Sequence, residues 1–148
     1  MIRGGARRAI EVEFDIRRQQ EKAQFQRVSI LRIDEDGWRK ADEFPAAYTL
    51  VFVLDQEPNP TWARAFREIF ERAFYLMKRR TDLRGDRIVM IVADRDDMQQ
   101  HADFAKRLVA ETNQFIEGDY FRRIDAHFDR EKRRALQEFD TISPSRTV

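Results

Sequence analysis

The chain has 148 residues, a formal net charge of +1 and 42% hydrophobic residues, which favours a single soluble globular domain. It contains no cysteine, so disulfides, a thiolate nucleophile and zinc sites built from cysteine are excluded. No apolar run approaches the roughly 18 residues of a membrane span, and the basic N-terminus lacks the apolar stretch of a signal peptide. We therefore expect a cytoplasmic protein.

An alternation of apolar and acidic residues predicts a first strand over residues 9–16. A period of two gives one apolar and one acidic face, which is typical of a half-buried strand. The apolar members are Ile10, Val12, Phe14 and Ile16.

The next segment is polar, and we expect residues 17–27 to form a flexible connection anchored by Phe25. Residues 28–33 predict a second strand. Asp36-Gly37 then predicts a tight turn into a short return segment, because glycine tolerates a positive φ.

Residues 47–54 are apolar at almost every position, which predicts a strand in the middle of a sheet. Asn59 is a favourable N-cap and Pro60 suits the first position of a helix. The helix is expected to run to about Arg80. Its apolar face comprises Trp62, Phe66, Ile69, Phe70, Ala73, Phe74 and Met77.

Gly85-Asp86 predicts a turn into another apolar strand at residues 87–93. A strand, a helix and a strand in succession imply a right-handed crossover, so residues 47–54 and 87–93 are predicted to pair in parallel.

Two further helices are expected. The first begins near residues 94–97, and Gly118 is a plausible C-cap or kink at its end. The second covers residues 119–140 and carries a thin apolar stripe in a dense field of charge. The stripe comprises Phe121, Ile124, Phe128, Ala135 and Phe139.

Acidic residues follow both strands of the predicted parallel pair, where α/β proteins tend to place ligands. Clustered carboxylates at that edge would suit Mg²⁺ and phosphoryl chemistry. The candidates are Asp55, Glu57, Asp94 and Asp96. The competing interpretation is that acids at a helix start cap it and offset its dipole, so no metal site is expected. No cofactor is expected either, because the sequence has no glycine-rich phosphate loop after a strand.

Arginine clusters offer a weak nucleic-acid surface. If several converged, they could follow a phosphate backbone, although acids lie close to each cluster and the pI is about 8.1. The candidates are Arg79, Arg80, Arg84, Arg133 and Arg134.

The sequence as a whole predicts an α+β fold with one mixed sheet of three to five strands, helices packed on one face and a long charged C-terminal helix. We expect a core domain over residues 1–118 and an interaction element over residues 119–148. A stripe this thin is typical of a helix that lies against a partner. The expected partner-binding residues are Phe121, Ile124, Phe128 and Phe139.

The favoured function is that of a small non-catalytic subunit or adaptor that forms homo-oligomers or docks in a larger bacterial assembly. Two alternatives remain open. One is a metal-dependent phosphotransfer or nuclease-like enzyme that uses the acidic edge, and the other is an accessory subunit that contacts RNA or DNA through its arginines. No membrane partner is expected.

Overall fold

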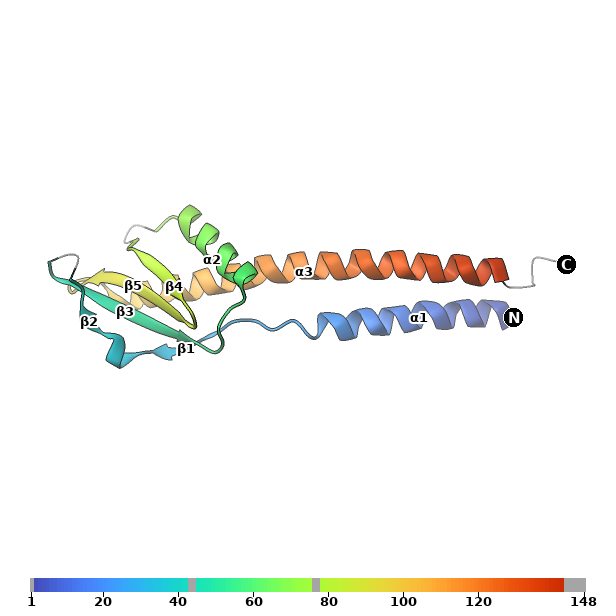
Figure 1. Cartoon of the computed structure of the whole chain (residues 1–148), viewed down its shortest axis with the longest axis horizontal. Coiled ribbons are helices and arrows are strands. Elements are labelled where there is room, and N and C mark those ends of the chain that lie inside the picture. Colours follow the sequence, from blue (N-terminus) through green and yellow to red (C-terminus); the bar gives the residue numbers. More distant parts are fainter. Residues whose placement is uncertain (1, 43–44, 76–77, 143–148) are drawn as a thin grey trace. The chain divides into compact units, whose positions relative to one another are not determined.

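The computed structural model describes residues 2–42, 45–75 and 78–142, and it has the α+β fold that the sequence predicts (Figure 1). The chain divides into two compact units. The hairpin unit consists of Met1–Gln26 with Glu117–Val148, and the sheet unit is Arg27–Ile116. The expected boundary at Gly118 lies next to one of these boundaries, whereas the N-terminal residues group with the C-terminal segment.

The sheet unit contains a five-stranded antiparallel sheet in the order β1-β3-β5-β4, with β2 paired to β3. The predicted central position of the apolar strand β3 is confirmed, because it has paired neighbours on both sides. A short 3₁₀ helix, η1 (Glu35–Gly37), follows β1. The strands are β1 (Ile30–Ile33), β2 (Arg39–Lys40), β3 (Ala47–Leu54), β4 (Thr81–Arg84) and β5 (Arg87–Ala93).

The predicted parallel pairing of β3 and β5 is wrong. The two strands are antiparallel, with Ala47 opposite Ala93 and Val53 opposite Arg87. The reason is β4, a short strand that the sequence analysis missed. The crossover leads from β3 to β4, and the turn at Gly85, whose φ is +59°, brings the chain back as β5 between them.

Helix α2 (Pro60–Arg72) begins as predicted, because the Asn59 side chain accepts a hydrogen bond from the backbone N–H of Trp62 at 2.9 Å. It ends at Arg72, well before the expected Arg80. The chain then turns back, and Lys78 Nζ donates to the carbonyls of Glu71 and Ala73. Met77, which was expected on the apolar face, lies outside the described residues.

Helices cover one face of the sheet, as expected. Helix α2 and the first part of α3 (Met98–Ile142) lie beside the sheet (Figure 1), and their side chains pack together with one face of β3 and β5. Along β5, alternate residues point into this core and are almost completely buried. The largest fully buried hydrophobic side chains of this core are those of Phe52, Leu54, Trp62, Phe66, Ile88, Met90, Val92 and Leu108.

A buried asparagine joins three segments of the sheet unit. Asn113 Oδ1, on α3, accepts hydrogen bonds from the backbone N–H of Val28 and from Trp62 Nε1, at 3.1 and 3.0 Å. Asn113 Nδ2 donates to the Val28 carbonyl at 2.7 Å. One amide therefore satisfies the backbone before β1 and the indole of α2 together.

The predicted strand at residues 9–16 is wrong, because these residues lie in a helix, α1 (Ile2–Lys22). Most of the connection predicted for residues 17–27 also belongs to this helix. A period of two over four apolar residues consists of two interleaved pairs four residues apart, Ile10 with Phe14 and Val12 with Ile16. On a helix each pair forms a face of its own.

The predicted break at Gly118 is absent, and α3 is one helix of 45 residues that includes the expected helix at 119–140. A glycine in a helix interior costs about 1 kcal/mol, which strong helix formers on both sides can offset. Gly118 does not adopt the left-handed conformation of a C-cap glycine, which among the described glycines occurs at Gly85. None of the helices in the described chain is both long and apolar enough to cross a membrane.

We predict that Phe66→Ala lowers the free energy of unfolding by about 3–5 kcal/mol, because Phe66 is 1% exposed in the core. The matched control is Phe74→Ala in the segment after α2, where the side chain is 81% exposed and the change should stay within about 0.5 kcal/mol. Urea unfolding measures both. Equal effects of the two substitutions would contradict this description of the core.

We also predict that Asn113→Leu destabilises the sheet unit by at least about 2 kcal/mol, because the substitution leaves buried groups of Val28 and Trp62 without partners. Trp62→Phe removes one of these groups and should lessen the additional cost of Asn113→Leu. A double-mutant cycle in urea measures this coupling. Strictly additive effects would show that the Asn113–Trp62 hydrogen bond contributes nothing.

Candidate functional site

The four acidic candidates do not meet. Asp55 follows β3 and Asp94 follows β5, and because these strands are antiparallel the two residues lie at opposite ends of the sheet. Glu57 is on the Asp55 side and Asp96 is on the Asp94 side. Among the described residues, no three side chains of the metal-ligating types come together.

Asp55 and Asp96 both have structural partners. Asp55 Oδ1 accepts a hydrogen bond from the backbone N–H of Ser29 at 2.9 Å. Asp96 has a side chain that is 4% exposed and receives two hydrogen bonds from Arg79, at 2.8 and 2.7 Å. These contacts fasten the segments before β1 and before β4 to the rest of the sheet unit.

Asp96 is the centre of a buried polar cluster. His101 Nε2 lies 2.8 Å from Asp96 Oδ2, and the imidazole is fully buried. Because an ionised carboxylate can only accept hydrogen bonds, Nε2 is the protonated ring nitrogen and donates a hydrogen bond to Asp96. The Tyr75 hydroxyl lies 3.5 Å from Nδ1, and its ring stacks on Phe104 with centroids 4.2 Å apart.

The hydrogen bonds from Arg79 hold the pKa of Asp96 well below its usual range. Burial opposes this shift, and the hydrogen bonds from His101 and from the Ala93 N–H reinforce it. Burial also raises the pKa of Tyr75, and the negative charge of Asp96 adds to that shift.

A phenol, an imidazole and a carboxylate in line can in principle relay a proton. Here the hollow beside the cluster, of about 340 Å³, is lined by Arg79 and not by Asp96 or His101. The carboxylate is already neutralised by Arg79, so the cluster serves to join the segment before β4 to the start of α3.

We predict that Asp96 contributes to acid stability. Its pKa is about 3.9 when unfolded and lower when folded, so its contribution is complete above about pH 4 and is lost as the pH falls towards the folded value. Asp96→Asn should therefore flatten the fall of unfolding free energy between about pH 4 and pH 2. Urea unfolding across this range measures the effect.

Arg79→Gln should flatten the same acid limb, since Arg79 is the main cause of the shift. An unchanged acid limb in both variants would contradict the assignment.

The arginine candidates are divided between the units. Arg79, Arg80 and Arg84 belong to the sheet unit, and Arg133 and Arg134 belong to the hairpin unit. Several have acidic partners: Arg79 pairs with Asp96, Arg84 pairs with Asp82 at 3.1 Å, and Arg134 pairs with Glu131 at 3.3 Å. Arg80 also lines the 340 Å³ hollow beside Arg79.

The candidate partner-binding stripe on α3 is covered by the chain itself. Ile124 and Phe128 are each 7% exposed and pack against Phe14 of α1. Phe121 is half-buried, with Lys22 Nζ 5.2 Å from its ring centre, and Phe139 is also half-buried. The apolar stripe that the sequence predicts to be covered by a partner is therefore covered largely by α1 of the same chain.

Ion pairs between α1 and α3 show the direction of this packing. Arg7 pairs with Asp140 at 2.8 Å, and Lys22 pairs with Asp125 at 2.9 Å, so rising numbers on α1 meet falling numbers on α3. The two helices form an antiparallel hairpin (Figure 1). Exposed pairs of this kind contribute about 0–1 kcal/mol each, so they fix the register more than they stabilise the unit.

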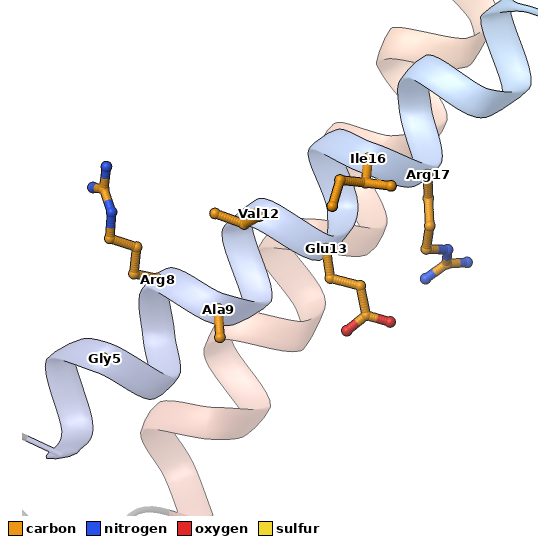
Figure 2. A pocket seen from close by; sticks show the side chains of 7 residues that line it. All are labelled: Gly5, Arg8, Ala9, Val12, Glu13, Ile16 and Arg17. Carbon is orange, nitrogen blue, oxygen red and sulfur yellow. The ribbon is translucent and has the colours of Figure 1, made fainter.

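The second apolar face of α1 is uncovered. Val12 and Ile16 are 48% and 52% exposed, and Figure 2 shows both on the side of α1 that faces away from α3. With Gly5 and Ala9 they form what we call the outer face of α1. They line a shallow hollow of about 480 Å³, which is bordered by Arg8, Glu13 and Arg17.

The sequence analysis missed the outer face because it placed Val12 and Ile16 on the same side of a strand as Ile10 and Phe14. One signal was available: residues 6–27 contain neither glycine nor proline, which favours a helix throughout. On a helix, residues 12 and 16 lie far around the axis from residues 10 and 14.

Comparison of the chain with protein-family models, with curated proteins and with solved structures gives no significant match in any of the three.

Proposed function

We propose that the chain is a small non-catalytic subunit or adaptor of a larger bacterial assembly, and that it acts through protein–protein contacts of its helical hairpin. The observation that carries the proposal is the outer face of α1. A helix in water normally presents one apolar face, which packs on its neighbour, and a polar face opposite. In α1 the face opposite α3 carries Val12 and Ile16 as well.

The C-terminal helix, which the sequence analysis expected to bind the partner, has a supporting role in this proposal. Ile124 and Phe128 support α1 from behind, and α1 presents the side chains that remain accessible. Interfaces of this type combine an apolar centre with a charged rim, and Arg8, Glu13 and Arg17 border the hollow in that way.

The two alternative functions receive less support. An enzyme that uses the acidic edge needs its carboxylates in one place, and Asp55 and Asp94 follow opposite ends of antiparallel strands. A nucleic-acid subunit needs cations available for phosphate, and Arg79 is held by Asp96 through two hydrogen bonds.

We predict that Val12→Ser with Ile16→Ser abolishes complex formation by the full chain and leaves the fold intact, because both side chains are about half exposed. Sedimentation of the purified protein and affinity capture from the native host measure the complexes, and circular dichroism measures helix content. The matched control is Leu31→Ser with Phe115→Ser, which removes side chains that are 63% and 58% exposed in the sheet unit.

Complexes should persist in the control and be lost in the outer-face variant. The proposal fails if the wild-type chain forms no complexes in either assay, or if the outer-face variant retains all of them.

A further inference from the structure

Small and large residues divide the outer face of α1 into two halves. Gly5 and Ala9 occupy its N-terminal half, and Val12 and Ile16 occupy its C-terminal half. The steps between them are four, three and four residues, which is the spacing of a coiled-coil seam. No atom outside the helix lies within 4 Å of the position that a Cβ on Gly5 would take, so the small end of the seam is open.

We propose that a second copy of this chain covers the outer face, with the two α1 helices packed antiparallel about a two-fold axis. The inference rests on the proposed function and names its partner. In this arrangement Val12 of each copy faces Ala9 of the other, and Ile16 faces Gly5. Each layer then combines one large and one small side chain, so the seam is filled evenly along its length.

A two-fold axis requires the face to complement itself. Every contact between one residue of the first copy and another residue of the second copy occurs again with the two copies exchanged. The charges on one edge of the seam meet that condition. Arg8 and Asp15 lie on the same edge, both are exposed, and antiparallel packing brings Arg8 of each copy to within about two residues' rise, or about 3 Å along the axis, of the level of Asp15 of the other. The Asp15 side chain is 61% exposed and has Lys132 at 3.5 Å, so it remains accessible to a second cation.

Parallel packing of the same faces fits less well. It would stack Gly5 on Gly5 and Ala9 on Ala9 at one end, and Ile16 on Ile16 at the other. The first end would then leave a gap while the second held the helices apart. Close packing without voids favours the antiparallel pair.

The first experiment measures mass against concentration by light scattering. The wild-type chain should shift from monomer to dimer, and Ile16→Glu should weaken this association at least tenfold, because it places a charge in the seam. The matched control is Ile142→Glu at the end of α3, where the side chain is 79% exposed and does not line the hollow of the outer face, and it should leave the association unchanged.

Charge reversal tests the edge independently of the seam. Arg8→Asp should weaken the dimer, because it places a second carboxylate near Asp15 of the other copy. Adding Asp15→Arg to the same chain should restore the dimer. Rescue by a second reversal is not expected from a merely local loss of helix stability.

The second experiment measures direction. The chain has no cysteine, so engineered cysteines are the sole thiols. A mixture of Gly5→Cys and Ile16→Cys chains should form a mixed disulfide on oxidation. Ile16→Cys alone should not, because antiparallel packing sets the two thiols about 16 Å apart along the axis, beyond the reach of a disulfide.

The inference is overturned if the wild-type chain is monomeric at every concentration, if Ile16→Glu leaves the dimer intact, or if Ile16→Cys cross-links to itself, which indicates parallel packing. The proposed function survives the first of these results if a different protein is captured by the wild-type chain and lost with Val12→Ser and Ile16→Ser. It fails with the inference if nothing depends on the outer face.

Discussion

A helix can bury one face against one neighbour, and α1 carries apolar side chains on two opposite faces. Ile10 and Phe14 meet α3, whereas Val12 and Ile16 do not. Complete burial of an exposed aliphatic side chain is worth about 1.5–3 kcal/mol, so covering the exposed half of Val12 and of Ile16 would contribute part of that free energy. The same apolar contact that holds α1 on α3 determines which side of α1 stays exposed, and this is the side that we propose a partner covers.

In the sheet unit, buried polar groups are committed to structure. Asn113 satisfies the backbone of Val28 and the indole of Trp62 with one amide. Asp96 and His101 are almost completely buried and hydrogen-bonded to each other. In a sequence, asparagine, aspartate and histidine side chains are readily taken for members of a catalytic or metal-binding site. In this fold their lone pairs and protons serve to join segments that are distant along the chain.

The sequence predicted those elements whose signal is local. Asn59 and Pro60 mark the start of α2, and the continuous apolar run of β3 marks a central strand. The errors concern information that is not local. β4 has four residues and one buried side chain, Leu83, so its pattern is weak, yet its presence reverses the pairing of β3 and β5.

The grouping of the four acidic candidates at one edge of the sheet was wrong for the same reason. Its members were grouped by a strand direction, and once β5 is antiparallel to β3, Asp55 and Asp94 separate to opposite ends of the sheet. The strand predicted over residues 9–16 failed because four apolar residues in alternation fit two periods. An alternation of this length fits both a strand with one apolar face and a helix with two. The polar residues 17–22, which continue the helix, are what distinguishes the two structures.

The thin stripe of α3 shows how apolarity and exposure differ as signs of an interface. The sequence indicated correctly that Ile124 and Phe128 need cover, and α1 supplies it within the same chain. Helix α1 buries one apolar face in doing so, and its other apolar face stays exposed to water. Apolarity in the sequence thus marks which helices must pack, and the structure is needed to show which apolar side chains stay exposed after packing. In the hairpin unit the outer face of α1, where Val12 and Ile16 keep about half of their area accessible, is the surface that we propose a partner covers.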